Sequence, residues 1–199
     1  MKPMTRALRA VLSIALAGAL LVGCGILGES EKSGGKTAAM DMQGAAEHAD
    51  AMLDATIKAV VPEIQWTHHT TTTGSCDVSR RRKVMTIISD ERRGSFLGVI
   101  ERFWKQSDYK ITAARKSKDR PAVFAQSPDG FGISLVFGHA GQAVFEVATP
   151  CVKESEVAES TTKPNGPAYP LGKIPTPNVR SDFWSAGEPI ASPAASSHP

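Results

Sequence analysis

Five histidines are the residues of this sequence best suited to bind a metal ion, but their spacing argues against such a site. His68 and His69 are adjacent in a threonine-rich segment that we expect to be a strand, where neighbouring side chains point to opposite faces. His48, His139 and His198 are scattered, and no two histidines have the ligand spacing of a zinc site. We therefore expect neither a bound metal nor a cofactor.

Candidate nucleophiles lack the local sequence that activates them. A serine elbow requires Gly-x-Ser-x-Gly, and Gly94-Ser95 and Gly132-Ile133-Ser134 both lack its second half. The paired carboxylates Asp90-Glu91 lie where we expect a helix to begin, a position at which acids complement the helix dipole. Phosphate-binding loops and dinucleotide fingerprints are also missing. We expect no catalytic residues, and we interpret the chain as a protein that is not an enzyme.

Cys24 is the cysteine whose surroundings predict a modification. Lys2, Arg6 and Arg9 precede an apolar run over residues 10–22, which has the length of a signal-peptide core and is too short to cross a membrane. Leu21-Val22-Gly23-Cys24 at its end resembles the lipobox of bacterial lipoproteins. The resemblance implies removal of residues 1–23, a diacylglycerol on the Cys24 thiol with acyl chains such as palmitate, and a place on the extracytoplasmic face of the cell membrane. The alternative is an ordinary signal peptide that leaves Cys24 as a spare thiol.

The other two cysteines form an even pair. An odd count in an exported protein leaves one thiol over, and lipidation accounts for Cys24. Cys76 lies in an expected turn, and Cys151 ends the last expected strand. Because export permits oxidation, we predict a Cys76–Cys151 disulfide.

Charge excludes a global attraction to nucleic acid. The chain has 23 basic and 20 acidic residues, and removal of the signal peptide leaves 20 of each. The run Arg80-Arg81-Arg82-Lys83 could form a basic patch with Arg92, Arg93 and Arg102 that faces an anionic lipid or a cell-wall polymer. We favour the alternative, a solvated hairpin end. The aromatic residues that readers of single strands interleave with basic ones are missing, so we expect no nucleic-acid partner.

Hydrophobic periodicity places one α+β domain at residues 39–151. Apolar residues recur at steps of three and four over residues 40–61 and again from about residue 91 or 95 to residue 106, which predicts two amphipathic helices. Six strand-like segments lie at residues 63–73, 82–89, 109–114, 122–126, 130–137 and 142–149. We expect the order α-β-β-α-β-β-β-β, with two helices packed on one face of an antiparallel sheet.

The segments that flank this domain are polar or rich in proline. Residues 24–38 are small and polar and predict a flexible tether between the lipid and the domain. Residues 152–199 hold 8 of the 13 prolines and few aliphatic residues, so we expect a disordered tail. Phe183-Trp184 is a candidate exception that docks on the domain. The alternative is a solvated tail with two stray aromatics.

Several short motifs resemble the mycobacterial LppA-type proteins, a family of actinobacterial lipoproteins of uncharacterised function. The shared pattern is a helix ending at Val60-Val61-Pro62, a strand with Trp66, Gly74-Ser75-Cys76, and a final strand that closes on Thr149-Pro150-Cys151. The resemblance covers residues 40–151 and implies a fold and a location. It implies no activity, and the Pro-rich tail departs from the family.

These observations favour a membrane-anchored binding or envelope-interaction module, whose partner is an unknown envelope protein, polymer or small ligand. The alternative is a carrier that holds a small apolar ligand between helices and sheet. An enclosed cavity would favour the carrier, and a full core with an exposed patch would favour the interaction module. The carrier's pocket would be lined by aromatic residues, namely Trp66, Phe96, Phe103, Trp104, Phe131, Phe137 and Phe145.

Overall fold

The computed structural model describes residues 40–167, 169–170 and 172–187. The signal peptide at 1–23, Cys24 and the tether at 24–38 lie outside the described residues, and so does the end of the tail at 188–199. What we predict for those segments therefore stays a prediction.

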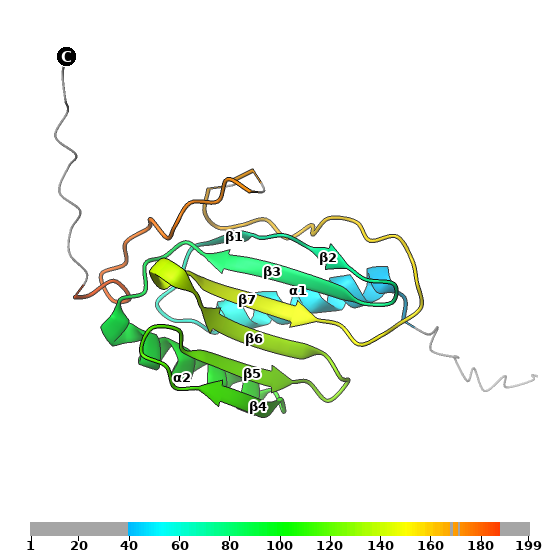
Figure 1. Ribbon diagram of the computed structural model, residues 1–199, viewed down its shortest axis with the longest axis horizontal. Coiled ribbons are helices and arrows are strands. Elements are labelled where there is room, and N and C mark those ends of the chain that lie inside the picture. Colours follow the sequence, from blue (N-terminus) through cyan, green and yellow to red (C-terminus); the bar gives the residue numbers. More distant parts are fainter. Residues whose placement is uncertain (1–39, 168, 171, 188–199) are drawn as a thin grey trace, which may run out of the picture. The chain divides into compact units, whose positions relative to one another are not determined.

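A single antiparallel sheet forms the centre of the domain (Figure 1). Its strands follow the spatial order β1-β3-β7-β6-β5-β4, and β2 also pairs with β3. β1 and β2 are thus two halves of one interrupted edge strand, which corresponds to the single first strand expected from the sequence. The strand bounds are β1 Trp66–His68, β2 Thr72–Thr73, β3 Val78–Val84, β4 Lys110–Arg115, β5 Ala122–Gln126, β6 Gly132–Phe137 and β7 Ala143–Ala148.

Two helices cover one face of this sheet, and none of the described α-helices lies on the other, helix-free face (Figure 1). α1 spans Met42–Lys58. Asp41 caps its N-terminus, because the Asp41 side chain accepts a hydrogen bond from the Gly44 amide at 2.9 Å. α2 spans Asp90–Gln106. The Trp104 indole N–H donates to the Thr56 hydroxyl at 3.1 Å and joins the helices. The α+β class and the order of elements are confirmed.

Alternation along the strands fills the space between sheet and helices. In β6 and β7 every second residue is buried, because one face of each strand packs on the helices. Phe96 of α2 is completely buried and lies in edge or tilted contact with Phe137 and Phe145. The aromatic residues considered as a pocket lining are therefore members of the packed core, and Phe103 packs at its margin.

The predicted disorder of the tail is wrong for its described part, residues 152–167, 169–170 and 172–187, which we call the strap. The strap runs along the β1 edge of the sheet and reaches the start of α2 (Figure 1). Trp184 is 1% exposed, packs 5.2 Å from the Phe96 ring, and donates its indole N–H to the Pro62 carbonyl at 2.7 Å. One aromatic anchor and many backbone contacts hold a segment whose composition offers few aliphatic residues.

Candidate interaction surfaces

The basic run lies inside the sheet, and its interpretation as a solvated hairpin end is wrong. β3 begins four residues earlier than expected and pairs on both sides, so Arg80 and Arg82 are 3% and 0% exposed. Arg80 Nε lies 3.3 Å from an Asp50 oxygen, and Arg82 ion-pairs with Asp50 at 3.6 Å and with Asp54. Buried charges require such partners. The charges of Arg80 and Arg82, which point toward the helices, are therefore neutralised by Asp50 and Asp54 of α1.

The strap completes this buried network. The Thr162 hydroxyl donates to Asp54 at 3.0 Å, and Arg80 donates to the Ala158 carbonyl at 2.5 Å. On the other side the Arg82 guanidinium lies 4.2 Å from the centre of the Trp66 ring. Because the partners of Arg80 and Arg82 come from α1, β1 and the strap, this charged cluster holds these three elements against β3.

Alternate residues of β3 point to the helix-free face of the sheet. There Arg81 makes two hydrogen bonds to Glu146, at 2.7 and 3.0 Å. Lys83 is 4% exposed, and desolvation lowers its pKa. Burial also lowers the pKa of His69, and the positive charges of Lys83 and Arg81 lower it further, while Glu146 opposes them. This face therefore carries the Arg81–Glu146 ion pair, a buried Lys83 and a histidine whose pKa is lowered.

The proposed patch of Arg80–Lys83 with arginines of α2 does not assemble, because α2 lies on the opposite face from Arg81 and Lys83. Arg93 pairs with Asp90 at 2.5 Å, and Arg92 lies 4.5 Å from the Phe183 ring of the strap. Arg102 is exposed on α2.

His68 and His48 have separate partners. His68 makes a 2.7 Å hydrogen bond to the Thr162 carbonyl, and His48 pairs with Asp129 at 3.0 Å. His139 lies in the turn between β6 and β7, and His198 lies outside the described residues. Within the part of the chain that the structure describes, no three His, Cys, Asp or Glu side chains are grouped to hold a metal ion.

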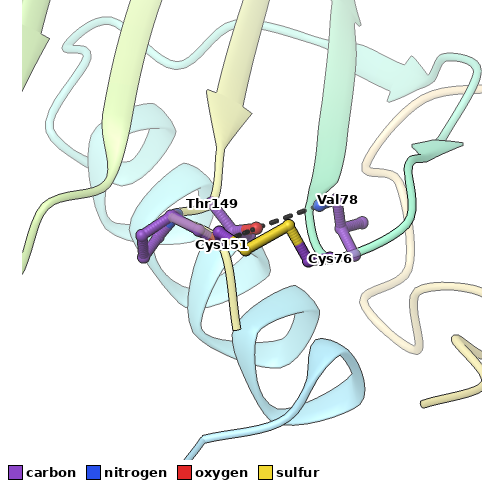
Figure 2. Close-up of a disulfide and its surroundings, with 5 residues drawn as sticks. Cys76, Val78, Thr149 and Cys151 are labelled. Atoms are coloured by element: carbon purple, nitrogen blue, oxygen red, sulfur yellow. Dashed lines mark hydrogen bonds between the residues drawn. A yellow bond between two sulfur atoms is a disulfide. The ribbon is translucent and has the colours of Figure 1, made fainter. Parts of the chain in front are cut away.

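Cys76 and Cys151 form the predicted disulfide (Figure 2). Their Cα atoms are 4.8 Å apart, within the range that a disulfide can bridge. Beside the bond, the Val78 amide donates to the Thr149 hydroxyl at 2.9 Å, and the Val152 amide donates to the Cys76 carbonyl at 2.7 Å. The bridge therefore joins the start of β3 to the point where the strap leaves β7.

A basic surface does exist, at a place that our reading of the sequence missed. The hairpin formed by β4, β5 and their loop carries five basic residues and one acid, Asp119, between residues 110 and 120. The side chains of all six are exposed, and among the described residues none of them forms an ion pair. The sequence feature that could have predicted this surface is the density of charge in Arg115-Lys116-Ser117-Lys118-Asp119-Arg120. The basic members are Lys110, Arg115, Lys116, Lys118 and Arg120.

A groove of about 540 Å³ lies between this hairpin and α2. Its helical wall contains Gly94, Leu97 and Gly98, and its sheet wall contains Ala114 and Val123. A Cβ atom added at Gly94 would meet nothing within 4 Å, so the missing side chain contributes directly to the hollow. The groove is open to solvent, unlike the enclosed cavity that a carrier needs.

A second open hollow, of about 700 Å³, lies near the start of α2. Its lining is largely polar and includes Arg93, Asp119, Arg120 and His139, together with Thr176 of the strap. Asp90 and Asp119 offset its basic residues, so its charge is mixed.

Comparisons with known proteins return no matching family model and no matching curated protein. Two crystal structures match. LppA from Mycobacterium tuberculosis, named as a lipoprotein, has a TM-score of 0.38 and 10% identity over 56% of this chain and 79% of its own. A DUF4853 family protein from Actinomyces odontolyticus has a TM-score of 0.31 and 12% identity over 70% of this chain and 78% of its own. The resemblance to LppA is thus found again in structure, as a likeness of fold.

Neither helix of the described part is both long and apolar enough to cross a bilayer.

Proposed function

We propose that this chain is a lipid-anchored protein of the extracytoplasmic face of the membrane, and that it binds its partner on its surface rather than catalysing a reaction. The anchor is the Cys24 thiol, which stands at the end of a signal-like segment. The domain behind it is stapled by the Cys76–Cys151 bridge, as suits an oxidising compartment.

The observation that carries surface binding is the filled core. Trp66, Trp104 and Phe131 are at most 4% exposed and pack in one cluster with Phe96 and the inward residues of the strands. A carrier needs unfilled space at that position, whereas a packed interior leaves recognition to the outside. The exposed basic hairpin and the open groove beside it are the surface features that could recognise a partner.

The experiment compares the wild-type chain with Cys24→Ala in a bacterial host that lipidates exported proteins. Metabolic labelling with an alkyne-bearing palmitate, followed by fractionation and protease treatment of cells stripped of their wall, reports both the acyl chain and the side of the membrane. We expect the wild type to be labelled, held in the membrane and accessible to protease. Cys24→Ala should lose the label and be either unprocessed or released.

The matched control is Ser30→Ala, a change a short distance downstream in the same polar segment, which should behave as the wild type. A Cys24→Ala chain that is still cleaved, labelled and membrane-bound would overturn the anchor. A purified wild-type chain that yields one tightly held apolar molecule per protein from its interior would overturn surface binding.

A further inference from the structure

We infer that the groove between α2 and the β4–β5 hairpin binds an anionic amphiphile, a molecule with one alkyl chain and a carboxylate or phosphate head. This inference deepens the proposed function, because it names the ligand class for surface binding. It rests on the shape of the groove, the composition of its floor and the charge of its rim.

The floor of the groove is apolar. Leu97 projects from α2, and Ala114 and Val123 project from the sheet. Gly94 and Gly98 are one helical turn apart and lie on the same side of α2. The space beside Gly94 is open and forms a channel, and the Arg102 guanidinium lies close to Gly98. A hollow of about 540 Å³ lies in the size range of small-molecule sites. Such a channel accepts the apolar chain of a ligand.

The rim of the groove is positively charged. Arg115, Lys116 and Lys118 line it, and none of the three has an ion-pair partner among the described residues. Two acids also line the groove, but each is already paired. Asp90 bonds Arg93 at 2.5 Å, and Glu101 bonds Lys105 at 2.6 Å. The charge left for a ligand is therefore basic, and an anionic head group complements it.

Protection of the sheet edge does not account for these charges. A charged residue within an edge strand is enough to discourage pairing with another chain, and Lys110 and Arg115 supply that in β4 itself. Lys116 and Lys118 lie in the loop beyond the strand, where there is no ladder to protect. Their concentration beside an apolar groove fits a head-group site.

The test uses the chain from residue 24 to residue 199 with Cys24→Ala, so that its own lipid and detergent are both absent. The probe is a dansyl-labelled undecanoic acid, whose fluorescence rises and shifts to the blue when the label leaves water. Its methyl ester lacks the negative head, and dansylglycine lacks the chain. We expect the acid to bind, the ester to bind about tenfold or more weakly, and dansylglycine not to bind. Binding of the acid should weaken with added salt, because the Debye length is about 10 Å at 0.1 M.

Two variants locate the site. Gly94→Leu fills the channel at a position where the added side chain meets open space, and leucine is the better helix former, so the melting temperature should stay or rise while binding is lost. Lys116→Glu with Lys118→Glu should weaken binding of the acid by about tenfold or more and bring its affinity close to that of the ester. The matched control is Lys163→Glu with Lys173→Glu, two exposed lysines of the strap at the opposite edge of the sheet.

Equal binding by both groove variants and the control would overturn the inference and place any amphiphile elsewhere. Equal competition by dansylglycine or by polyglutamate would also overturn it, because the hairpin would then be an electrostatic surface with no use for a chain. Neither result touches the proposed function, since anchoring is read from Cys24 in cells and surface binding from the packed core.

Discussion

The β1 edge of the sheet lies under the strap, whereas no described segment covers the β4 edge on the opposite side, which we call the bare edge (Figure 1). At the covered edge, Asn165 of the strap accepts a hydrogen bond from the Trp66 amide at 3.1 Å and donates to the Ile64 carbonyl at 2.9 Å. These two backbone groups at the edge thus bond within the chain. An exposed row of such groups would otherwise invite another chain to pair.

The bare edge is protected by different means. The pairing of β4 with β5 shifts register between Ile111 and Ala113, which marks a bulge, and bulges twist an edge away from regular pairing. Lys110 and Arg115 add charge at the two ends of the strand. One edge is thus closed by the strap, while the other stays accessible to solvent and to a partner in the described part of the chain. We therefore locate recognition at the β4 edge.

The largest effect on stability is expected at the point where the strap begins. Cys76→Ser removes a bridge that spans 75 residues. In the chain-entropy model the loss is about 4.5 kcal/mol, less any strain in the native state. Thermal and denaturant unfolding should show this loss, and mild reduction of the wild type should reproduce it. An unchanged melting temperature, or two free thiols by mass spectrometry of the oxidised wild type, would contradict the expectation.

Removal of the anchor at the other end of the strap should have the next largest effect. Trp184→Ala empties a buried aromatic site, and we expect a loss of about 3 kcal/mol, at the lower end of the usual range because the strap can shift into the space. Hydrogen exchange should also report it locally. The Ser89 amide, which bonds the Trp184 carbonyl at 2.9 Å, and the Trp66 amide should lose protection, while those of β5 and β6 keep theirs.

The control for this change is the neighbouring aromatic. Phe183 is 39% exposed, and its ring contact with Arg92 is worth at most about 1 kcal/mol. Phe183→Ala should therefore cost much less than Trp184→Ala. Equal effects of the two changes, or unaltered exchange at Trp66, would mean that the strap does not protect the β1 edge through Trp184.

The elements that follow ordinary patterning were predictable from the sequence. β5 matches its expected bounds, and β6 and β7 lie within those expected, because apolar and polar residues alternate in them. α1 is shorter than expected at both ends, since the periodic residues continue past Lys58 into the turn before Pro62. In these elements the residues that the apolar pattern marks for burial are the residues that the structure buries.

The remaining parts depend on contacts that local patterning does not contain. Arg80 and Arg82 occupy inward positions of β3 that a pattern assigns to apolar residues. Asp50 and Asp54 of α1 pair with them there, and the strap completes the network. The strap is held by hydrogen bonds to residues far away in the sequence, and the Trp184 indole donates to a carbonyl 122 residues away. The basic hairpin was visible as charge density, but the groove beside it depends on the packing of α2 against β4 and β5.

The smallest effect on stability is expected from changes at the bare edge. Lys110→Thr with Arg115→Thr removes both strand charges but no buried contact, because both side chains are exposed. We expect the free energy of unfolding to change by no more than about 0.5 kcal/mol. Threonine favours extended backbone, so the uncharged edge should pair with a second copy. Light scattering and sedimentation at rising protein concentration should detect dimers or larger species.

The control for this change is Lys163→Thr with Lys173→Thr, in the strap at the covered edge, which should stay monomeric under the same conditions. If both pairs of changes leave the chain monomeric, the bulge alone protects β4, and the charges of Lys110 and Arg115 are then free to serve the ligand.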